Sequence, residues 1–425
     1  MSKLALLGGE PVIPDSLPAY PSMGEAEERA AVEVVRSGCL SGFFGSAGWE
    51  FLGGPKVREF EAAWAEHYGV AHAVSVNSAT SGLIAAMGAI GLGPGDEVVV
   101  PPWTMSATAV APLLYGAIPV FADVEDETFC LDVDAAAAAI GPRTRAIVAV
   151  NLFGHPARLA RLREIADDKG LTLVEDSAQA PLASEDGRLA GTVGHVGVYS
   201  LNFHKHIHAG EGGVCVTDDD RLAERLRLIR NHGENAAHEA PDGDITNLVG
   251  FNFRLTELGA AIALVQLADI ETHVGRRETL AGALSDGTRD LAGWRVPAIR
   301  DGCRHNFYEW VVRFDAAAAG VSRALFSKAL AAEGFPHFTG YVAPLYRLPL
   351  FRQRKAIGGD GFPFTLGERE YGVGLCPVAE RLYEKEAILF EPCAFDVGAA
   401  MAARLVEAVR KVHDNRDRLN AAQEA

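Results

Sequence analysis

Cysteine is scarce in this chain, and no two cysteines form a CxxC pair. The 425 residues include six of them, at positions 39, 130, 215, 303, 376 and 393. A structural zinc site or a disulfide framework normally needs closely spaced cysteines. The spacing therefore predicts reduced thiols, with neither disulfide bonds nor a bound metal.

Basic residues and long apolar runs are also in short supply. Lysine and arginine number 39 against 56 acidic residues, and the formal charge of −17 repels phosphate backbones and anionic membrane surfaces. No run reaches the ~18 apolar residues of a membrane span, and the apolar part of MSKLALLGGEPV is too short for a signal peptide. We expect a cytoplasmic protein that has neither nucleic acid nor a membrane as a partner.

From about residue 70 the chain alternates β-branched apolar runs with Ala/Leu-rich runs, separated by Gly, Pro, Asn or Asp. Repeated strand and helix units of this kind indicate an α/β fold with a mainly parallel sheet that helices sandwich. The expected helices cover residues 79–90, 104–117, 132–140 and 157–170. The expected strands cover residues 71–78, 98–102, 118–124, 145–154 and 171–176.

The alternation of strands and helices ends after residue 176. Residues 196–201 and 213–218 are strand-like but leave no room for a crossover helix, so they should be antiparallel neighbours. A helix is expected over 254–270, where an apolar stripe of Leu255, Leu258, Ile262 and Val265 should pack on the core or on a partner subunit.

The last third of the chain predicts a smaller α+β domain. We place a large domain, with the N-terminal segment, at residues 1–275 and the small C-terminal domain at residues 276–425. The segment 339–376 is rich in Gly, Pro, Arg and aromatic residues, which is typical of a long functional loop or lid.

Three stretches fall where strands end and helices begin, which is where open α/β sheets bind ligands. The first is NSATSG at residues 77–82. Backbone N–H groups and the positive end of the helix dipole favour a phosphate there, and Thr80 and Ser81 add hydroxyl donors. The alternative is that Asn77 or Ser78 simply caps the helix.

The second stretch is LVEDSAQA at residues 173–180, where two carboxylates follow a buried apolar run. Asp176 should project from the strand end into the cleft, while alternation of side chains sends Glu175 to the other face of the sheet. The alternative is that Asp176 caps the turn that follows the strand.

The third stretch is YSLNFHKHIHAGEGGV, residues 199–214, in which Lys205 stands among histidines and before a glycine-rich run. A partly buried lysine loses some of its preference for being charged, and only its neutral amine attacks a carbonyl. A solvated surface charge is one alternative. Another is a metal site on one face of a strand, made by His204, His206 and His208, although no acidic or cysteine ligands accompany them.

Together the three stretches supply a phosphate cradle, a carboxylate at a strand end and a lysine in a loop. Pyridoxal 5′-phosphate needs all three, because its phosphate, its pyridine nitrogen and its aldehyde bind the helix end, the carboxylate and the lysine respectively. The glycines at 210, 212 and 213 permit the tight turn that a loop beside such a ligand needs.

The chain resembles the sugar and cyclitol aminotransferases of the DegT/StrS family over roughly residues 10–415. The resemblance rests on GLGPGDEVVVPPWT, EDSAQA, the serine-to-lysine spacing of SLNFHK, GEGGVCVT, LIRNHG and GFNFRLTELGAAIALVQL. It implies fold type I of the pyridoxal-phosphate enzymes, the aspartate-aminotransferase-like fold, and a homodimer with shared active sites.

The resemblance also implies a role for each matching residue. Lys205 forms a Schiff base with the cofactor and acts as the general base, Asp176 holds the pyridine nitrogen protonated, and Gln179 contacts the ring hydroxyl. Asn252, in GFNFR, reaches the phosphate of the neighbouring subunit. The remaining phosphate contacts fall on Thr80, Ser81 and Ser200.

One position departs from the family pattern. The residue after the threonine of the P-x-x-T segment is usually an aromatic side chain that stacks on the pyridine ring, and here it is Met105. Methionine packs against a ring through its polarizable sulfur but gives no aromatic stack.

The implied reaction is a ping-pong transfer of an amino group from L-glutamate or L-glutamine to a keto-sugar, nucleotide-linked or not, or to a keto-cyclitol, in secondary-metabolite or glycan biosynthesis. A second hypothesis keeps the cofactor but makes the reaction a sugar dehydration or an aminohydroxybenzoate-synthase-like dehydration. Some relatives of that kind carry histidine in place of the lysine, so Lys205 counts against it. A third hypothesis, a non-catalytic ligand-binding protein, conflicts with the retained lysine and aspartate.

Overall fold

The computed structural model describes residues 3–240 and 243–424, and its largest element is a seven-stranded sheet with the order β1-β9-β8-β5-β4-β2-β3. The five strands from β8 to β3 run parallel, whereas β9 is antiparallel to both of its neighbours. Every strand expected between residues 71 and 218 is present, and so is the antiparallel pair. The strands are β1 (His72–Val76), β2 (Glu97–Val100), β3 (Ile118–Phe121), β4 (Thr144–Val150), β5 (Thr172–Asp176), β8 (Val196–Ser200) and β9 (Gly213–Thr217).

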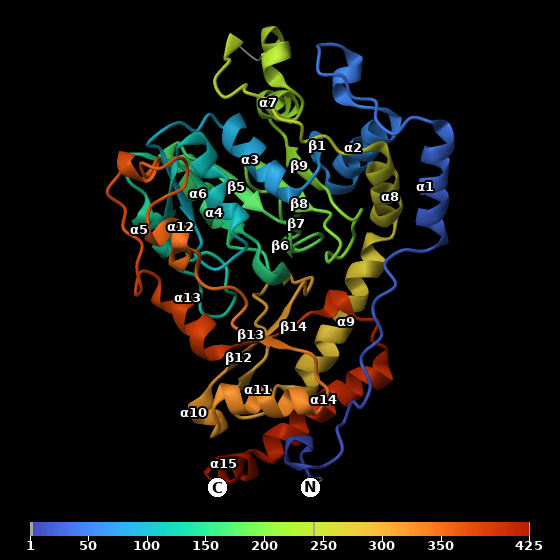
Figure 1. Cartoon of the computed structure of the whole chain (residues 1–425), viewed down its shortest axis with the longest axis vertical. Helices are drawn as coiled ribbons and strands as arrows, with labels where there is room; N and C mark the ends of the chain where they lie inside the picture. Colours follow the sequence, from blue (N-terminus) through green and yellow to red (C-terminus); the bar gives the residue numbers. More distant parts are fainter. Residues whose placement is uncertain (1–2, 241–242, 425) are drawn as a thin grey trace.

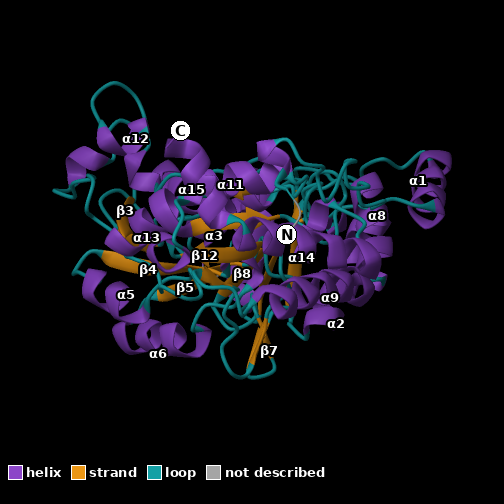
Figure 2. Cartoon of the chain, turned by 90° about the horizontal axis from the view of Figure 1, so that it is seen from below, coloured by secondary structure: helices purple, strands orange, loops and turns teal. Residues whose placement is uncertain are grey.

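Helices pack along this sheet, as the alternating pattern predicts, and Figure 2 shows α5 and α6 along one side of β4 and β5. Almost all residues of the central strands are buried, which explains why their sequences are continuous apolar runs. The helices of this part are α2 (Pro55–Tyr68), α3 (Ala79–Ala89), α4 (Ala107–Val110), α5 (Val133–Ala139), α6 (Leu159–Lys169) and α7 (Asp220–Arg230).

Two expected helices differ from the structure. The one expected over 104–117 is only the short α4 followed by a 3-10 turn, because Pro112 lacks the N–H that would continue the α-helix. The one expected over 254–270 is α8 (Glu257–Ala268), which Thr256 caps through the Gly259 N–H.

The apolar stripe predicted for α8 is not the face that packs on the core of its own chain, so its packing on a partner subunit stays a prediction. Leu255 is buried but precedes the helix, and Leu258, Ile262 and Val265 are only half-buried. The helix packs instead through its small residues, such as Ala260 and Ala263, against α2 and α1 (Glu25–Ser37). Short side chains allow the closer approach of neighbouring helices, which the spacing of large apolar residues does not reveal.

A second core surrounds a four-stranded antiparallel sheet with the order β10-β12-β14-β13. This second core confirms the predicted smaller α+β part of the fold. Its strands are β10 (Trp294–Arg295), β12 (Trp310–Phe314), β13 (Phe338–Thr339) and β14 (Ala387–Phe390). The helices with it are α9 (Ile270–Thr288), α10 (Ala316–Ala319), α11 (Arg323–Ala332), α14 (Ala399–Asp414) and α15 (Arg416–Glu424).

The N-terminal segment packs with this second core, where Leu4, Val12, Ile13 and Leu17 are buried. Figure 1 shows both ends of the described chain at this end of the molecule, and the N-terminal trace rises from there to α1. Helix α9 runs without a break through residue 275, so the boundary between 275 and 276 stays a prediction.

The segment 339–376, predicted to be a long functional loop or lid, is irregular apart from short helical turns, but it is packed against the large sheet. It contains α12 (Pro349–Arg352) and precedes α13 (Pro377–Arg381), and its aromatic residues Tyr346, Phe351, Phe364 and Tyr371 belong to the core of the large sheet. Aromatic burial, not composition, decides its structure. A small sheet with the order β11-β6-β7 completes the fold, with strands β6 (Ser184–Glu185), β7 (Arg188–Leu189) and β11 (Cys303–Arg304).

All six cysteines are free thiols, as their spacing predicts. None of the helices in the described ranges is long and apolar enough to cross a membrane. The cytoplasmic location stays a prediction.

Candidate active site

A cavity of about 210 Å³ opens beside the carboxyl ends of β4, β5 and β8. This is the edge of the sheet where the three sequence stretches were expected to meet. Six of the eight predicted site residues line it, namely Thr80, Met105, Asp176, Gln179, Ser200 and Lys205. The two others, Ser81 and Asn252, are not among its lining residues.

Lys205 lies in the connection between β8 and β9, where its backbone N–H donates to the Asn202 carbonyl at 2.9 Å. Its Nζ atom stands 4.1 Å from the centroid of the Tyr308 ring, a cation–π contact with a residue that also lines the cavity. Burial lowers the pKa of the Lys205 amine to about 8, and the Asp176 carboxylate opposes part of that shift. The solvated-charge alternative is therefore wrong, since the amine is held in the cavity wall and its pKa is lowered.

Asp176 is the last residue of β5 and is buried. Its Oδ2 atom accepts a hydrogen bond from the Thr108 hydroxyl at 2.7 Å, and its Oδ1 atom accepts one from the Ala178 N–H at 3.2 Å. Burial raises the pKa of this carboxyl group, and these two donors offset part of the rise. The carboxylate thus faces the cavity with few donors, so a cationic N–H group at this point would stabilise its charged form.

Glu175 points to the opposite side, as the alternation of side chains predicts. Its carboxylate accepts hydrogen bonds from the N–H groups of Gly191, Val193 and Gly194 and from the Asn151 amide. It therefore organises the loop before β8 and takes no part in the cavity.

Gln179 is fixed by two hydrogen bonds. Its Oε1 atom accepts from the Phe153 N–H at 2.6 Å, and its Nε2 atom donates to the Tyr341 hydroxyl at 3.0 Å. Tyr341 comes from the 339–376 segment and lines the cavity too. Packing of that segment against the large sheet thus brings one of its side chains to the site.

The start of α3 confirms the capping interpretation of NSATSG, while the phosphate site stays a prediction. Ser78 caps the helix, since its hydroxyl accepts from the Ser81 N–H at 3.0 Å, and the Ser81 hydroxyl donates to the side chain of Asn77 at 2.6 Å. Thr80 remains exposed at the helix terminus and lines the cavity. Gly213 allows this approach, because a Cβ atom there would lie 2.7 Å from the Ala79 nitrogen.

Met105 and Asn252 are both surface-exposed. Met105 lines the cavity with 58% of its surface exposed. Asn252 lies outside, and its side-chain oxygen accepts from Arg254 Nε at 2.8 Å.

The three histidines do not share a strand face, because residues 201–212 form turns. His204 lines the cavity, His206 is buried with its Nε2 atom 3.0 Å from the Asn306 carbonyl, and the Nδ1 atom of His208 accepts from the Gly210 N–H. Within residues 3–240 and 243–424, no three metal-type side chains form a cluster that could hold an ion.

The residues at this site fit pyridoxal 5′-phosphate. An amine of lowered pKa and a buried carboxylate line the same cavity, as does a helix terminus with an exposed hydroxyl. Together with the mixed, mainly parallel sheet, these features define a fold type I pyridoxal-phosphate enzyme.

The profile of the "DegT/DnrJ/EryC1/StrS aminotransferase family" matches residues 44–387, and the chain belongs to that family. It is thus a pyridoxal-phosphate-dependent aminotransferase. It is 36% identical over 372 residues to L-glutamine:2-deoxy-scyllo-inosose aminotransferase of Streptomyces kanamyceticus, covering 84% of this chain and 85% of that protein. It is 33% identical over 396 residues to dTDP-3-amino-3,4,6-trideoxy-alpha-D-glucose transaminase of Streptomyces venezuelae, covering 92% and 93%.

Solved structures of other proteins share this fold. A crystal structure of DesI in the presence of its TDP-sugar product superposes with a TM-score of 0.82 at 31% identity, covering 99% of each chain. The structure of 3-amino-5-hydroxybenzoic acid synthase superposes with a TM-score of 0.78 at 27% identity, covering 95% of this chain and 99% of that one.

Proposed function

We propose that this enzyme moves an amino group from L-glutamate or L-glutamine to the ketone of a polyhydroxylated ring, a keto-sugar or a keto-cyclitol. The observation that carries the proposal is that Lys205, from the connection between β8 and β9, and Asp176, from the end of β5, line one cavity. The two Streptomyces relatives, which act on a sugar and on a cyclitol, support the substrate class.

When bound, pyridoxal phosphate supplies an electron sink for the carbon that exchanges its amino group. The Asp176 carboxylate would hold the ring nitrogen and keep it protonated. Because the pKa of Lys205 is about 8, a useful fraction of its amine is neutral near physiological pH. That amine would move the proton between the substrate carbon and the cofactor, acting as general base and then as general acid.

The remaining cavity wall suits a substrate with several hydroxyl groups. His204, Tyr308 and Glu211 line it, and Glu211 accepts two hydrogen bonds of 3.0 Å from the Asn202 amide. These side chains offer both donors and acceptors to ring hydroxyls. No large apolar side chain other than Met105 is exposed among the residues that line this cavity.

The test is a product assay with the purified holoenzyme. L-Glutamate or L-glutamine is supplied with either 2-deoxy-scyllo-inosose or a dTDP-linked keto-sugar, and mass spectrometry follows the amine product. Amine formation from either ketone supports the proposal and separates the two substrate classes. Accumulation of a deoxygenated product without amine would establish the dehydratase alternative instead.

Lys205→Ala should reduce amine formation at least ~100-fold, because the general base is removed. Lys56→Ala is the matched control, since Lys56 is a surface lysine whose Nζ pairs with Glu59 at 2.8 Å. It should retain wild-type activity. Equal activity of Lys205→Ala and the control would contradict the assignment of Lys205.

We also propose a homodimer in which Asn252 serves the site of the partner subunit. In support, Asn252 is exposed outside its own cavity, and several large apolar side chains are exposed on the same chain. They include Leu40, Phe44, Trp49, Phe203 and Val249.

Mixing two inactive variants tests this arrangement. In a hybrid of Lys205→Ala and Asn252→Ala subunits, a shared site leaves one cavity with both wild-type residues, so activity should return after subunit exchange. If Asn252 acted within its own chain, no cavity would be intact and the mixture would stay inactive.

A further inference from the structure

Two carboxyl groups stand together at the end of the strand pair β12 and β14. In this antiparallel pair Trp310 lies opposite Phe390, and the next residues beyond them are Glu309 and Glu391. Residues opposite each other across two antiparallel strands point to the same face, with about 5 Å between their Cβ atoms. The two glutamates are therefore near neighbours, and like charges in such positions repel each other.

The face that carries the two glutamates is turned to the large sheet. Side chains alternate along a strand, so Glu309 and Glu391 share a face with Val311 and Leu389. Val311 and Leu389 belong to the core of the large sheet, whereas the residues that alternate with them belong to the second core. Both carboxyl groups thus point toward the part of the fold that contains Lys205.

Glu309 is the more deeply buried member of the pair. It is only 3% exposed, and its Oε2 atom has no hydrogen-bond partner among residues 3–240 and 243–424. Glu391 is half-buried. Burial raises the pKa of both carboxyl groups, Glu391 adds to the rise for Glu309, and the charge of Lys205 opposes the rise for each. Two carboxyl groups that share a buried site do not ionise together, so the more exposed one loses its proton first.

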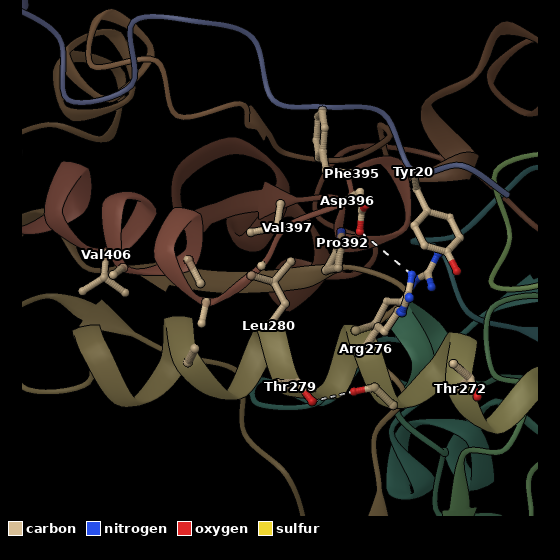
Figure 3. A pocket seen from close by; sticks show the side chains of 17 residues that line it. Tyr20, Thr272, Arg276, Thr279, Leu280, Pro392, Phe395, Asp396, Val397 and Val406 are labelled. Carbon is tan, nitrogen blue, oxygen red and sulfur yellow. Dashed lines mark hydrogen bonds and ion pairs between the residues drawn. The ribbon is translucent and has the colours of Figure 1, made fainter.

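The other titratable groups beside the pair are neutral. Burial raises the pKa of the Cys393 thiol to about 12, and it also raises the pKa of the phenols of Tyr308 and Tyr341. Arg277 is a further buried cation of this region, but it hydrogen-bonds to Cys393 and lines a separate cavity of about 920 Å³ between α9 and α14 (Figure 3). Lys205 is thus the cation whose charge acts on both glutamates.

We propose that Glu309 and Glu391 share one proton, which Glu309 holds, so that Glu391 presents a single negative charge to Lys205. Neither glutamate lines the Lys205 cavity, so both are positioning residues. A negative charge nearby favours the protonated form of a buried lysine. The pair would therefore help Lys205 to hold the proton that it takes up as a general base, a consequence that rests on the proposed function.

Labelling of Lys205 with potassium cyanate tests the proposal without any substrate. Cyanate reacts with the neutral amine, and peptide mass mapping of the full-length, cofactor-free chain follows residue 205 as the pH is varied. The wild-type midpoint should lie at about 8. Glu309→Gln should leave it within about 0.3 units, because it removes the carrier of the proton and no charge. The double variant Glu309→Gln, Glu391→Gln should lower it by about one unit, because the negative charge is lost.

Glu386→Gln is the matched control. Glu386 precedes β14 at its other end, where it pairs with Arg313 at 3.2 Å. Its loss should leave the Lys205 midpoint unchanged. An unchanged midpoint in the double variant would overturn the proposal, because no negative charge would then act on Lys205. A fall in Glu309→Gln as large as that in the double variant would also overturn it. Since the labelling needs no amino transfer, the proposed function can fail while this proposal stands.

Infrared difference spectra give a second test that does not need the double variant. Near neutral pH, the spectrum of the wild type minus that of Glu309→Gln should contain the band of one protonated carboxyl group. The same difference for Glu386→Gln should lack this band, because Glu386 is ion-paired with Arg313. Absence of the band for Glu309→Gln would show that Glu309 holds no proton and would contradict the proposal.

Discussion

Thr108 is a residue of α4 whose hydroxyl donates to Asp176, the carboxylate that we propose holds the ring nitrogen of the cofactor. Its hydroxyl provides the shorter of the two hydrogen bonds to the carboxylate, 2.7 Å against 3.2 Å from the Ala178 N–H. Thr108→Val keeps the shape of the side chain and removes this donor. Because Thr108 is fully buried, water cannot replace the lost bond without rearrangement.

The expected effect follows from the charge of the acceptor. A hydrogen bond to a charged group contributes about 1.5–3 kcal/mol, which corresponds to a further rise of about one to two units in the pKa of Asp176. When the pKa of Asp176 rises, its charged form is less stable and stabilises the protonated ring nitrogen less. We therefore expect kcat/KM of Thr108→Val to fall about 10-fold to 100-fold.

The assay is kcat/KM for amine formation, with the affinity for pyridoxal phosphate measured by absorbance titration. Thr128→Val is the matched control, because the buried Thr128 hydroxyl also donates to a carboxylate, that of Glu125, away from the cavity. It should lose stability but keep kcat/KM within twofold of wild type. A loss in Thr108→Val no larger than that in Thr128→Val would refute the reasoning.

Three further predictions test other parts of the site. The Lys205 pKa of about 8 predicts that capture of pyridoxal phosphate by the cofactor-free enzyme speeds up as pH rises, with a midpoint near 8, and stopped-flow absorbance checks this; a midpoint near the usual lysine value would contradict it. The pKa of Lys205 lies below the value of 10.5 for an unfolded chain, so between pH 8 and pH 10.5 the unfolded chain binds more protons than the folded one. This group therefore makes the cofactor-free fold more stable as the pH rises from 8 to 10.5. Denaturant titrations at pH 8 and above detect the sign, and a fall in this contribution would be evidence against a buried amine. Glu175→Ala should lose ~3 kcal/mol or more of unfolding free energy in urea titration, because the N–H groups of Gly191, Val193 and Gly194 lose their acceptor; an unchanged midpoint would show that water replaces it.

Much of the large domain could be predicted because its signals are local. A parallel strand buried on both faces needs a continuous apolar run, so β2, β3, β4 and β5 are visible without any partner. The alternation of side chains in a strand likewise assigns Asp176 to the cavity and Glu175 to the opposite face. The spacing of large apolar residues was a poorer guide for α8, because several of the residues that this helix buries are small.

The site was predicted in part for the same reason. The ends of parallel strands meet at one edge of a sheet, which brings residues 80, 176, 200 and 205 to one cavity. Thr108 carried no comparable signal, since its role depends on a hydrogen bond to a side chain 68 residues away. Tyr341 lies in the segment predicted to be a functional loop, but its hydrogen bond with Gln179, 162 residues away, had no signal in the sequence. Ser81 shares a motif with Thr80, yet the turn of the helix directs it to Asn77.

The amino-acid sequence by itself determined the strands, the family and the lysine and aspartate of the site, because each depends on short-range pattern or motif. Only the tertiary structure decided that the N-terminal segment packs with the C-terminal core, that the aromatic residues of 346–371 enter the core of the large sheet, and that Arg277 is buried beside a large cavity. These outcomes depend on contacts between residues far apart in the chain, whose burial is settled by the shape of the whole molecule and has no signature in neighbouring residues.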